Sequence, residues 1–490
     1  MMRKIQAVHE NQEKIRWLTI FRFPLAMWVV LHHFLDSNFE STINLQGFWK
    51  VLADTGNLAV TSFFILSGFV IALSFSVRDY KKVSKFYLNR WAALFPLFIL
   101  MQMSSAFSQP LESRYLLVNI LGLQPFLTGG YWFNLNGPAW SVSVEFFMYM
   151  IFPVIFRVTS KITKPVKALL VLLLIEFSLT LLIGHFTSVN TAFYILYHFP
   201  IFQLFHFISG IFAFKIYVDW KSSKKFTQNG VNLIAGPIFA VAVYGSFYTN
   251  IQYLKYGALI VIPTLFYVIG SAVASKNSTT SNDSLLYKAG EATFVIYITH
   301  WLWVGTLRKI LVSEKNLNLM MLYYFILLIP IIVIAHLFNK KYVKSLAIII
   351  SNPKAISNYR TRFVGTISIF LCMSLVLGFA NRSFPRYWNT QNSPKNGAVS
   401  IEVVSASLSN QETKVNVEIQ IINRSENAQS IESCRIFITP RDLKLYGDMP
   451  PPIHVPLNLL LKPNEGGRTS MQTEWLPRYS KNFQTTVTCA

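Results

Sequence analysis

Two ionisable side chains interrupt the first long apolar stretch of the sequence, residues 16–36. Arg22 and His33 lie eleven positions apart, about three helical turns at ~100° per residue, so both face the same side of a helix. Along the helix axis they are separated by roughly 16 Å. An imidazole that titrates near neutrality can act as a general base. The pattern predicts a fixed cation, Arg22, at one depth of the helix and a general base, His33, at the other. His32, on a different face of the helix, is the weaker candidate for the base.

A second polar set occurs within residues 138–157. Ser141, Glu145 and Tyr149 follow one another at intervals of four, which places them in one stripe down a helix. In apolar surroundings a carboxylate must find a partner or take up a proton. Glu145 is therefore a candidate for orienting a catalytic imidazole and stabilising its charged form. A purely structural, hydrogen-bonded glutamate is the alternative.

Tyr297 and His300 form a third, weaker set within the apolar residues 291–310. They are three positions apart and share a helix face, although a histidine in the middle of a helix is often a packing residue. Ionisable groups at the depth of a bilayer are costly and therefore indicate function. The alternative for the first set is structural: Arg22 would extend to the lipid headgroups and His33 would lie at the membrane interface.

The elements that must position these residues are transmembrane helices. Hydrophobic residues make up 52% of the chain and charged residues 13%, whereas soluble domains average about 25% charged residues. The mean hydropathy is +0.40, so a soluble protein is excluded for the chain as a whole. Apolar stretches long enough to cross a bilayer as helices lie near 16–36, 54–76, 87–108, 138–157, 165–185, 196–215, 229–248, 254–275, 291–310, 317–338 and 362–380. The first is expected to be an anchor and not a cleaved signal peptide.

The distribution of Lys and Arg predicts the orientation of these helices. Basic residues concentrate in alternate segments between the spans, beginning with the N-terminus, as is typical of cytoplasmic segments. The N-terminus is therefore predicted to be cytoplasmic, and an odd number of spans places the C-terminus outside. Topology explains the net charge of +22, and no nucleic-acid partner is predicted.

A second domain follows the last span. Short runs in it alternate apolar and polar residues, as half-buried strands do, at 399–404, 415–422, 434–438, 453–461, 469–475 and 485–489. They predict an all-β, immunoglobulin-like sandwich. The expected organisation is a polytopic α-helical membrane domain of ten helices (1–345), an eleventh helix with linkers (346–397) and an extracytoplasmic β-sandwich (398–490). The sandwich is expected to be a structural or acceptor-binding module.

Three cysteines occur in the chain. Cys372 falls in the eleventh span and is interpreted as a packing residue. Cys434 and Cys489 both fall in the exported domain, where disulfides persist. A bridge between them is the favoured interpretation, although the sequence does not give the distance that such a bond requires.

Four motifs, in order, resemble those of the bacterial membrane acyltransferase family three, whose members O-acylate cell-surface glycans. The resemblance covers roughly residues 15–345. The Arg-x10-His motif of the first span matches Arg22 and His33. The W-S-x-x-x-E motif, with its following Tyr and Pro, matches Trp140, Ser141, Glu145, Tyr149 and Pro153. The second-span and late motifs match Gly56, Phe64, Leu66, Ser67, Gly68, Phe69, Gly290, Thr293, Tyr297 and His300.

The chain departs from this family in three places. After the second span the family has an arginine-rich stretch, of which only Arg90 and Pro96 are present here, with Asn89 and Ala93 in place of two arginines. Donor binding would then depend on Arg90, with help from Lys81, Lys82 and Lys85. In the sixth span Gln203 and His206 occupy the region where the family has a charged residue. The C-terminal domain also differs from the hydrolase-like domain of many relatives.

The resemblance implies an inner-membrane O-acetyltransferase. It would move an acetyl group from cytoplasmic acetyl-CoA, a co-substrate and not a bound cofactor, to a sugar hydroxyl of a surface polysaccharide such as lipopolysaccharide or of a lipid-linked glycan. His33 would act as the general base with help from Glu145, and Arg22 would line the path of the pantetheine arm. The residues expected near the acyl donor are Arg90, Ser67, Ser141, Tyr149, Tyr297 and His300, and no metal site is expected. Direct transfer and a relay through an acylated side chain fit equally well.

Two other classes of function compete with this interpretation. A transporter or flippase for a lipid-linked glycan would also have many spans and buried polar groups. The sequence, however, has no detectable two-half repeat and no paired interrupted helices of the kind that transporters favour. The other alternative is a membrane platform that docks the β-domain, which leaves Arg22, His33 and Glu145 unexplained. Membrane lipids are expected partners in every case.

Overall fold

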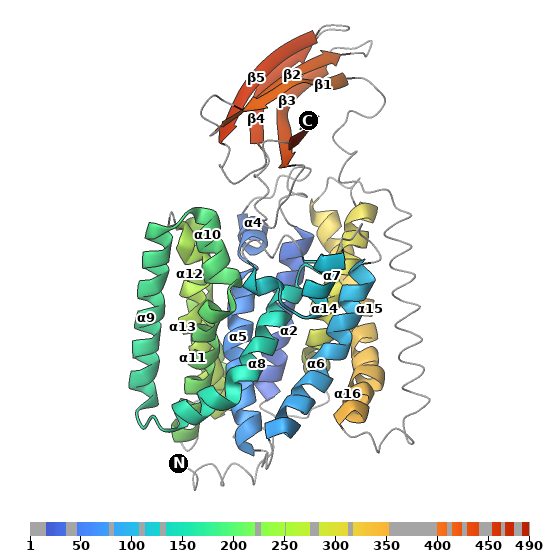
Figure 1. The fold of residues 1–490 in the computed structure, drawn as a ribbon. Helices are drawn as coiled ribbons and strands as arrows, with labels where there is room; N and C mark the ends of the chain where they lie inside the picture. Colours follow the sequence, from blue (N-terminus) through green and yellow to red (C-terminus); the bar gives the residue numbers. More distant parts are fainter. Residues whose placement is uncertain are drawn as a thin grey trace. The chain divides into compact units, whose positions relative to one another are not determined.

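The computed structural model describes two sets of residues, each belonging to a compact unit that is treated by itself. The helical unit is described over 16–35, 47–77, 83–106, 113–127, 134–220, 227–249, 251–274, 284–311 and 317–351. The second unit is described over six strands between 399 and 489. Figure 1 shows the elements and their labels. The predicted span 362–380, Cys372 and the lysines Lys81 and Lys82 lie outside the described residues.

Long helices make up most of the helical unit (Figure 1). They are α2 (Arg16–Phe34), α5 (Leu58–Val77), α6 (Val83–Ala106), α8 (Ala139–Ser160), α9 (Pro165–Phe186), α11 (Pro200–Trp220), α12 (Gln228–Tyr248), α13 (Val261–Ala274), α14 (Leu285–Leu311) and α15 (Leu317–Phe338). Shorter elements connect them: α4 (Gly47–Asp54), α7 (Ser113–Ile120), η1 (Gln124–Phe126), α10 (Val189–Phe193), η3 (Tyr194–His198), η4 (Gln252–Tyr256), η5 (Ala258–Ile260), η7 (Asn339–Val343) and α16 (Lys344–Ser351). Each of the first ten predicted spans overlaps one of the long helices.

Six helical segments among the described residues are long and apolar enough to cross a membrane. They are α5, α8, α9, the segment Thr191–Trp220 that includes α11, α12, and the segment Met321–Ile350 that includes α15. This result agrees with the predicted class, a polytopic helical membrane protein. The predicted number of eleven spans stays a prediction. Helices α2, α6 and α14, which are not among the six, carry Arg22, Arg90 and His300, and polar side chains of this kind lower the mean hydropathy of a helix.

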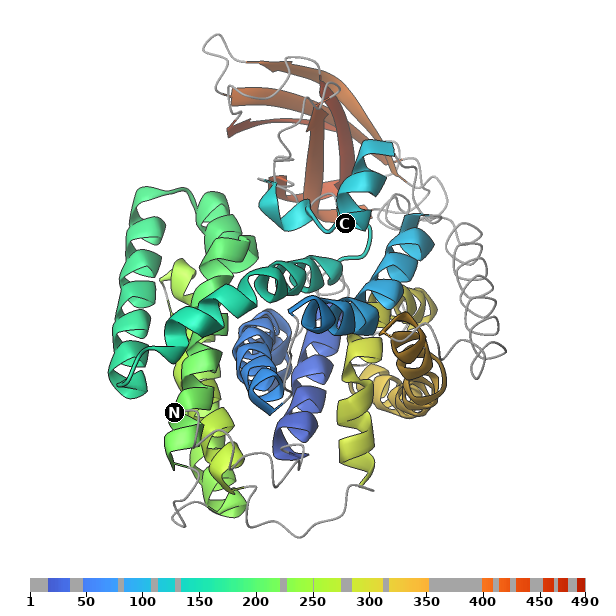
Figure 2. The same cartoon turned by 60° about the horizontal axis from the view of Figure 1, so that its bottom comes forward.

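Helix α2 lies between α5 and α14 (Figure 2), and α5 also packs along α11. Glycines allow two of these contacts. A Cβ atom on Gly68 of α5 would lie 2.0 Å from the carbonyl oxygen of Phe207 in α11. A Cβ atom on Gly290 of α14 would lie 2.1 Å from the carbonyl oxygen of Thr19 in α2. Both glycines belong to the motifs singled out in the sequence, and their place in the fold is at close approaches between helix backbones.

The second unit contains β1 (Val399–Leu408), β2 (Lys414–Asn423), β3 (Gln429–Pro440), β4 (Ile453–Leu461), β5 (Gly466–Glu474) and β6 (Phe483–Cys489). All pairings between them are antiparallel. The strands form two three-stranded sheets, with the orders β1-β2-β5 and β4-β3-β6. Strand β1 approaches β6, and β4 approaches β5. Each of the six alternating runs in the sequence overlaps one strand.

Candidate active site

Two histidines on neighbouring helices lie within hydrogen-bond distance of each other. Nδ1 of His33, near the end of α2, lies 2.9 Å from the carbonyl oxygen of Val29 and 3.3 Å from Nε2 of His300 in α14. Nδ1 of His300 lies 2.5 Å from the carbonyl oxygen of Tyr297. A carbonyl oxygen only accepts, so Nδ1 of each ring carries the hydrogen. In the neutral state, His33 therefore keeps its lone pair on Nε2, the nitrogen that a general base would use.

His300 is fully buried, and Trp301 packs edge-on against His33 with ring centroids 5.4 Å apart. The neighbouring His32 points elsewhere: its Nδ1 contacts the carbonyl oxygen of Ala53 in α4. The two adjacent histidines lie on different faces of α2, and it is His33 whose ring nitrogen lies within hydrogen-bond distance of His300 in α14. The histidine that the sequence favoured as a base is thus the one that meets a second imidazole.

Helix α8 adds a serine and helix α14 a tyrosine to this group. The hydroxyl of Ser141 donates to the carbonyl oxygen of Pro138 at 2.9 Å and lies 2.7 Å from the hydroxyl of Tyr297. Since serine has one hydroxyl hydrogen, Tyr297 donates and Ser141 accepts. Asn136 ties the start of α8 to α14 by donating to the carbonyl oxygen of Ile298 at 2.9 Å. The imidazole group, as we call it, consists of His33, Ser141, Tyr297 and His300.

A separate network surrounds Glu145, one helical turn from Ser141 on α8. Ser67 of α5 donates to Oε1 of Glu145 at 2.5 Å, and the hydroxyl of Tyr149 donates to the same oxygen. The two hydroxyls lie 3.0 Å apart. Both hydroxyls thus converge on one oxygen of the Glu145 carboxyl group. Glu145 is half-buried, so its carboxyl group depends on partners nearby.

Two arginines lie close to this network. Arg22 of α2 lies within range of electrostatic interaction with Glu145, Tyr149 and Arg90. Arg90 of α6 donates to the hydroxyl of Ser74 in α5 at 3.1 Å. The carboxylate group, as we call it, consists of Arg22, Ser67, Arg90, Glu145 and Tyr149.

All nine residues that the sequence predicted for the site therefore fall into one of two groups. The groups are joined by shared helices: α2 carries Arg22 and His33, and α8 carries Ser141 and Glu145. From the sequence, Glu145 was predicted to orient His33. In the structure, the hydrogen bonds described above join His33 to Val29 and His300, whereas those of Glu145 go to Ser67 and Tyr149.

One buried network, around Glu176 of α9, is not among the site residues predicted from the sequence. Oε1 of Glu176 lies 2.9 Å from Nε2 of His206 in α11, an ion-pair contact that is not aligned as a hydrogen bond. Nδ1 of His206 lies 2.7 Å from Oε1 of Gln203, whose amide donates to the carbonyl oxygens of Leu196 and Tyr197. Because α11 begins with a proline, which has no N–H, the glutamine supplies donors that the backbone lacks at this kink. A single carboxylate in a long apolar helix was the available signal.

Comparison with known proteins identifies the family of the chain. The model of the acyltransferase domain family, acyltransferase family 3, matches residues 15–340. The acyltransferase MdmB of Streptomyces mycarofaciens is 30% identical over 167 residues, which cover 31% of this chain and 41% of MdmB. The match thus spans about two-fifths of the length of that relative. No solved structure matches. The family model covers both groups of polar residues, and the chain belongs to acyltransferase family 3.

Proposed function

We propose that the protein is a membrane O-acetyltransferase that moves an acetyl group from acetyl-CoA to a hydroxyl of a surface polysaccharide or lipid-linked glycan. The observation that carries the proposal is the pairing of His33 with His300. It fixes the hydrogen of His33 on Nδ1 and leaves the lone pair on Nε2. A positioned imidazole of this kind is the usual general base for activating a hydroxyl.

In this mechanism Nε2 of His33 takes the proton of the sugar hydroxyl. The oxygen attacks the thioester carbonyl carbon, the tetrahedral intermediate loses the C–S bond, and the thiolate of CoA takes up the proton. Val29 and His300 both accept from Nδ1–H, which stabilises the positive charge that His33 carries between these steps. Tyr297 is the donor that we assign to the oxyanion, since its hydroxyl can exchange Ser141 for the substrate.

The carboxylate group binds the donor in this proposal. Arg22 and Arg90 attract the phosphates of acetyl-CoA, while Glu145 holds Ser67 and Tyr149 in place and keeps the two arginines from repelling each other. Along α2, Arg22 and His33 are separated by roughly 16 Å, the spacing of eleven residues at ~1.5 Å each. The pantetheine arm would cover this distance and bring the thioester to His33. A relay through an acylated side chain uses the same geometry.

The proposed topology has a cytoplasmic N-terminus and an extracytoplasmic C-terminal unit, in the inner membrane of a bacterium. Its support is the distribution of Lys and Arg between the spans. Acetyl-CoA would then enter from the cytoplasm, and the glycan would approach from the other side. We propose that the two sheets of the C-terminal unit pack as an immunoglobulin-like sandwich that helps to bind the acceptor.

The first test compares cells carrying the wild type, His33→Ala or no copy of the gene. Proton NMR measures the O-acetyl content of surface polysaccharide, and a blot checks that the variant reaches wild-type abundance. We expect His33→Ala to resemble the deletion, because general-base help is worth about 10²–10⁴-fold. In parallel, purified protein is assayed for thiol release from acetyl-CoA. Unchanged O-acetylation in the deletion strain, or no consumption of acetyl-CoA, would contradict the proposal; the latter result would favour a flippase.

A further inference from the structure

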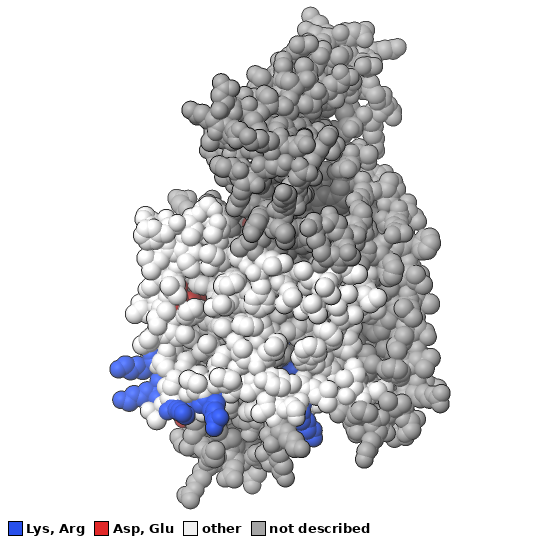
Figure 3. Space-filling model, viewed as in Figure 1, with Lys and Arg blue, Asp and Glu red and all other residues white. Residues whose placement is uncertain are grey.

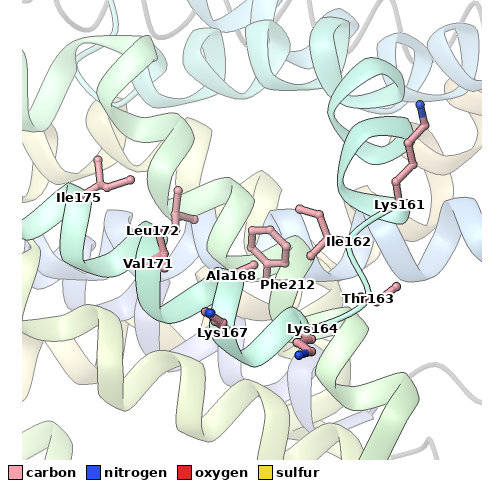
Figure 4. Close-up of a pocket in the computed structure, with 10 residues that line it drawn as sticks. All are labelled: Lys161, Ile162, Thr163, Lys164, Lys167, Ala168, Val171, Leu172, Ile175 and Phe212. Carbon is pink, nitrogen blue, oxygen red and sulfur yellow. The ribbon is translucent and has the colours of Figure 1, made fainter.

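A surface hollow lies where the α8–α9 connection meets α11. Its volume is about 580 Å³, and it is formed by residues 161–164, the first turns of α9, and Phe212 of α11. Figure 4 shows Lys164 and Lys167 at the start of α9 and Val171, Leu172 and Ile175 on its following turns. The lining thus changes from basic to apolar along a single helix.

The length of this lining matches one leaflet of a bilayer. From Lys164 to Ile175 is eleven residues, roughly 16 Å at ~1.5 Å per residue. Half of the hydrocarbon core of a membrane is about 15 Å thick. If the lysines lie at headgroup level, the apolar part of the hollow reaches from there toward the middle of the membrane.

The hollow also opens toward the surroundings of the helical unit. Only 17% of the membrane-length window of α9 is buried, against 72% for α5. Side chains next to the apolar part, such as Leu170 and Leu174, are exposed. On a helix that crosses a membrane, such side chains meet acyl chains. An occupant would therefore enter sideways from the bilayer and not from water.

The charge of the hollow is positive. Its lining contains Lys161, Lys164 and Lys167 and no acidic residue. The buried amine of Lys215 in α11 donates to the carbonyl oxygens of Thr159, in the last turn of α8, and of Ile162, just after that helix. There it offsets the negative end of α8. In Figure 3 the described basic side chains on the visible face gather at one end of the helical unit.

We propose that this hollow binds an anionic phospholipid, with its phosphate on Lys164 and Lys167 and one acyl chain along Val171, Leu172, Ile175 and Phe212. Orientation of the helices by basic residues accounts for lysines at this level but not for an apolar hollow that continues from them. Basic pockets between membrane helices are known sites for anionic headgroups. The bound lipid would hold the α8–α9 connection, and with it the helix that carries Ser141 and Glu145.

The test measures lipid binding to the purified full-length protein. Phosphatidylglycerol or phosphatidylcholine is titrated into micelles, with native mass spectrometry counting bound lipid and thermal unfolding giving the midpoint. We expect phosphatidylglycerol to bind and to raise the midpoint. The double variant Lys164→Gln/Lys167→Gln is expected to bind about thirtyfold more weakly, as the loss of two lysines facing an anionic lipid implies. A charge-matched control, Lys340→Gln/Lys341→Gln, removes two exposed lysines outside the hollow and is expected to bind like the wild type.

A second variant, Leu172→Trp, fills the apolar part of the hollow without changing the charge. It is expected to weaken the binding of phosphatidylglycerol as well. If Lys164→Gln/Lys167→Gln and the control Lys340→Gln/Lys341→Gln lose equal affinity for phosphatidylglycerol, the lysines act by general attraction to anionic lipid and the proposal is overturned. Binding that Leu172→Trp leaves intact would overturn it too. If inorganic phosphate or CoA raises the midpoint in a manner that depends on Lys164 and Lys167 while phosphatidylglycerol does not, the site binds a soluble phosphate and not a lipid. None of these readouts depends on acyl transfer.

Discussion

The proton on Nδ1 of His33 has two acceptors, and this makes the role of His300 testable. A glutamine at position 300 can present an oxygen near the place of Nε2, whereas a leucine presents no acceptor. We expect His300→Leu to lower kcat for thiol release from acetyl-CoA by roughly 10²-fold, because the imidazolium form of His33 loses a partner. His300→Gln is expected to retain most of the activity.

The KM for acetyl-CoA is expected to change little in both position-300 variants, since the carboxylate group is untouched. Steady-state rates of purified protein, with folded yield checked by size exclusion, separate these outcomes. Equal losses in the leucine and glutamine variants would show that the ring of His300 acts by packing and not as an acceptor.

Candidate site residues could be chosen from their spacing within single helices, but the way in which they pair could not. The intervals between Arg22 and His33, or between Ser141 and Glu145, depend only on the geometry of one helix and could be read directly. Pairs that join different helices depend on how the helices pack. The contact of His33 with His300, for example, requires α2 to lie against α14, and no spacing within one segment reports that.

At the scale of elements, the close contact of α5 with α11 depends on two glycines. A Cβ on Gly68 would lie 2.0 Å from the carbonyl oxygen of Phe207, and one on Gly210 would lie 2.0 Å from that of Ile65. Backbone atoms cannot yield as the end of a flexible side chain can, so the helices must separate. We expect Gly68→Ala to lower the thermal midpoint sharply and to reduce the folded yield.

The matched control for this prediction is Gly236→Ala in α12, where an added Cβ meets nothing within 4 Å. There alanine is expected to leave the midpoint unchanged or to raise stability by about 0.5–1 kcal/mol, its advantage over glycine inside a helix. Thermal unfolding of both variants in the same detergent is the measurement. A Gly68→Ala protein as stable as the wild type would mean that the two helices do not approach as described.

Long elements were predictable and short ones were not. A stretch of about twenty apolar residues signals a helix by length alone, so each of the first ten predicted spans overlaps a helix. The eight-residue helices α4 and α7 lack such a signal. The π-helical turn η3 is held by Gln203, whose amide donates to two carbonyl oxygens beside a proline. Such a contact produces no periodic pattern of apolar residues in the sequence.

At the scale of the whole molecule, the composition of the sequence changes after Ala380, and the predicted domain boundary depends on that change. The membrane unit was predictable because lipid permits few backbone structures. The C-terminal strands were predicted from period-two alternation, which marks a sheet with one covered face. How strands β3 and β6 pair could not be predicted, since that register links segments far apart in the chain.

That register carries a prediction about both the fold and the compartment. Cys434 of β3 and Cys489 of β6 are paired Cα partners. Opposed residues of antiparallel strands have Cα atoms about 4.5–5.5 Å apart, within the range of about 4.4–6.8 Å that disulfides span. A bond there would close a loop of about 55 residues, worth ~4 kcal/mol in the chain-entropy account. It persists only in an oxidising compartment, so it also tests the proposed export of the C-terminal unit.

We therefore expect protein isolated from cells under alkylating conditions to contain a Cys434–Cys489 disulfide. Trypsin would release the two cysteines in the peptides 425–435 and 482–490, joined in one species before reduction and separate after it. Cys372, in the peptide 363–382, serves as the internal control and should be alkylated without reduction. Reduction should lower the unfolding midpoint of the C-terminal unit. If the isolated protein carries both thiols free but forms the bond readily when oxidised after purification, the register is supported and the export is contradicted. If the bond does not form even then, the pairing of β3 with β6 is wrong.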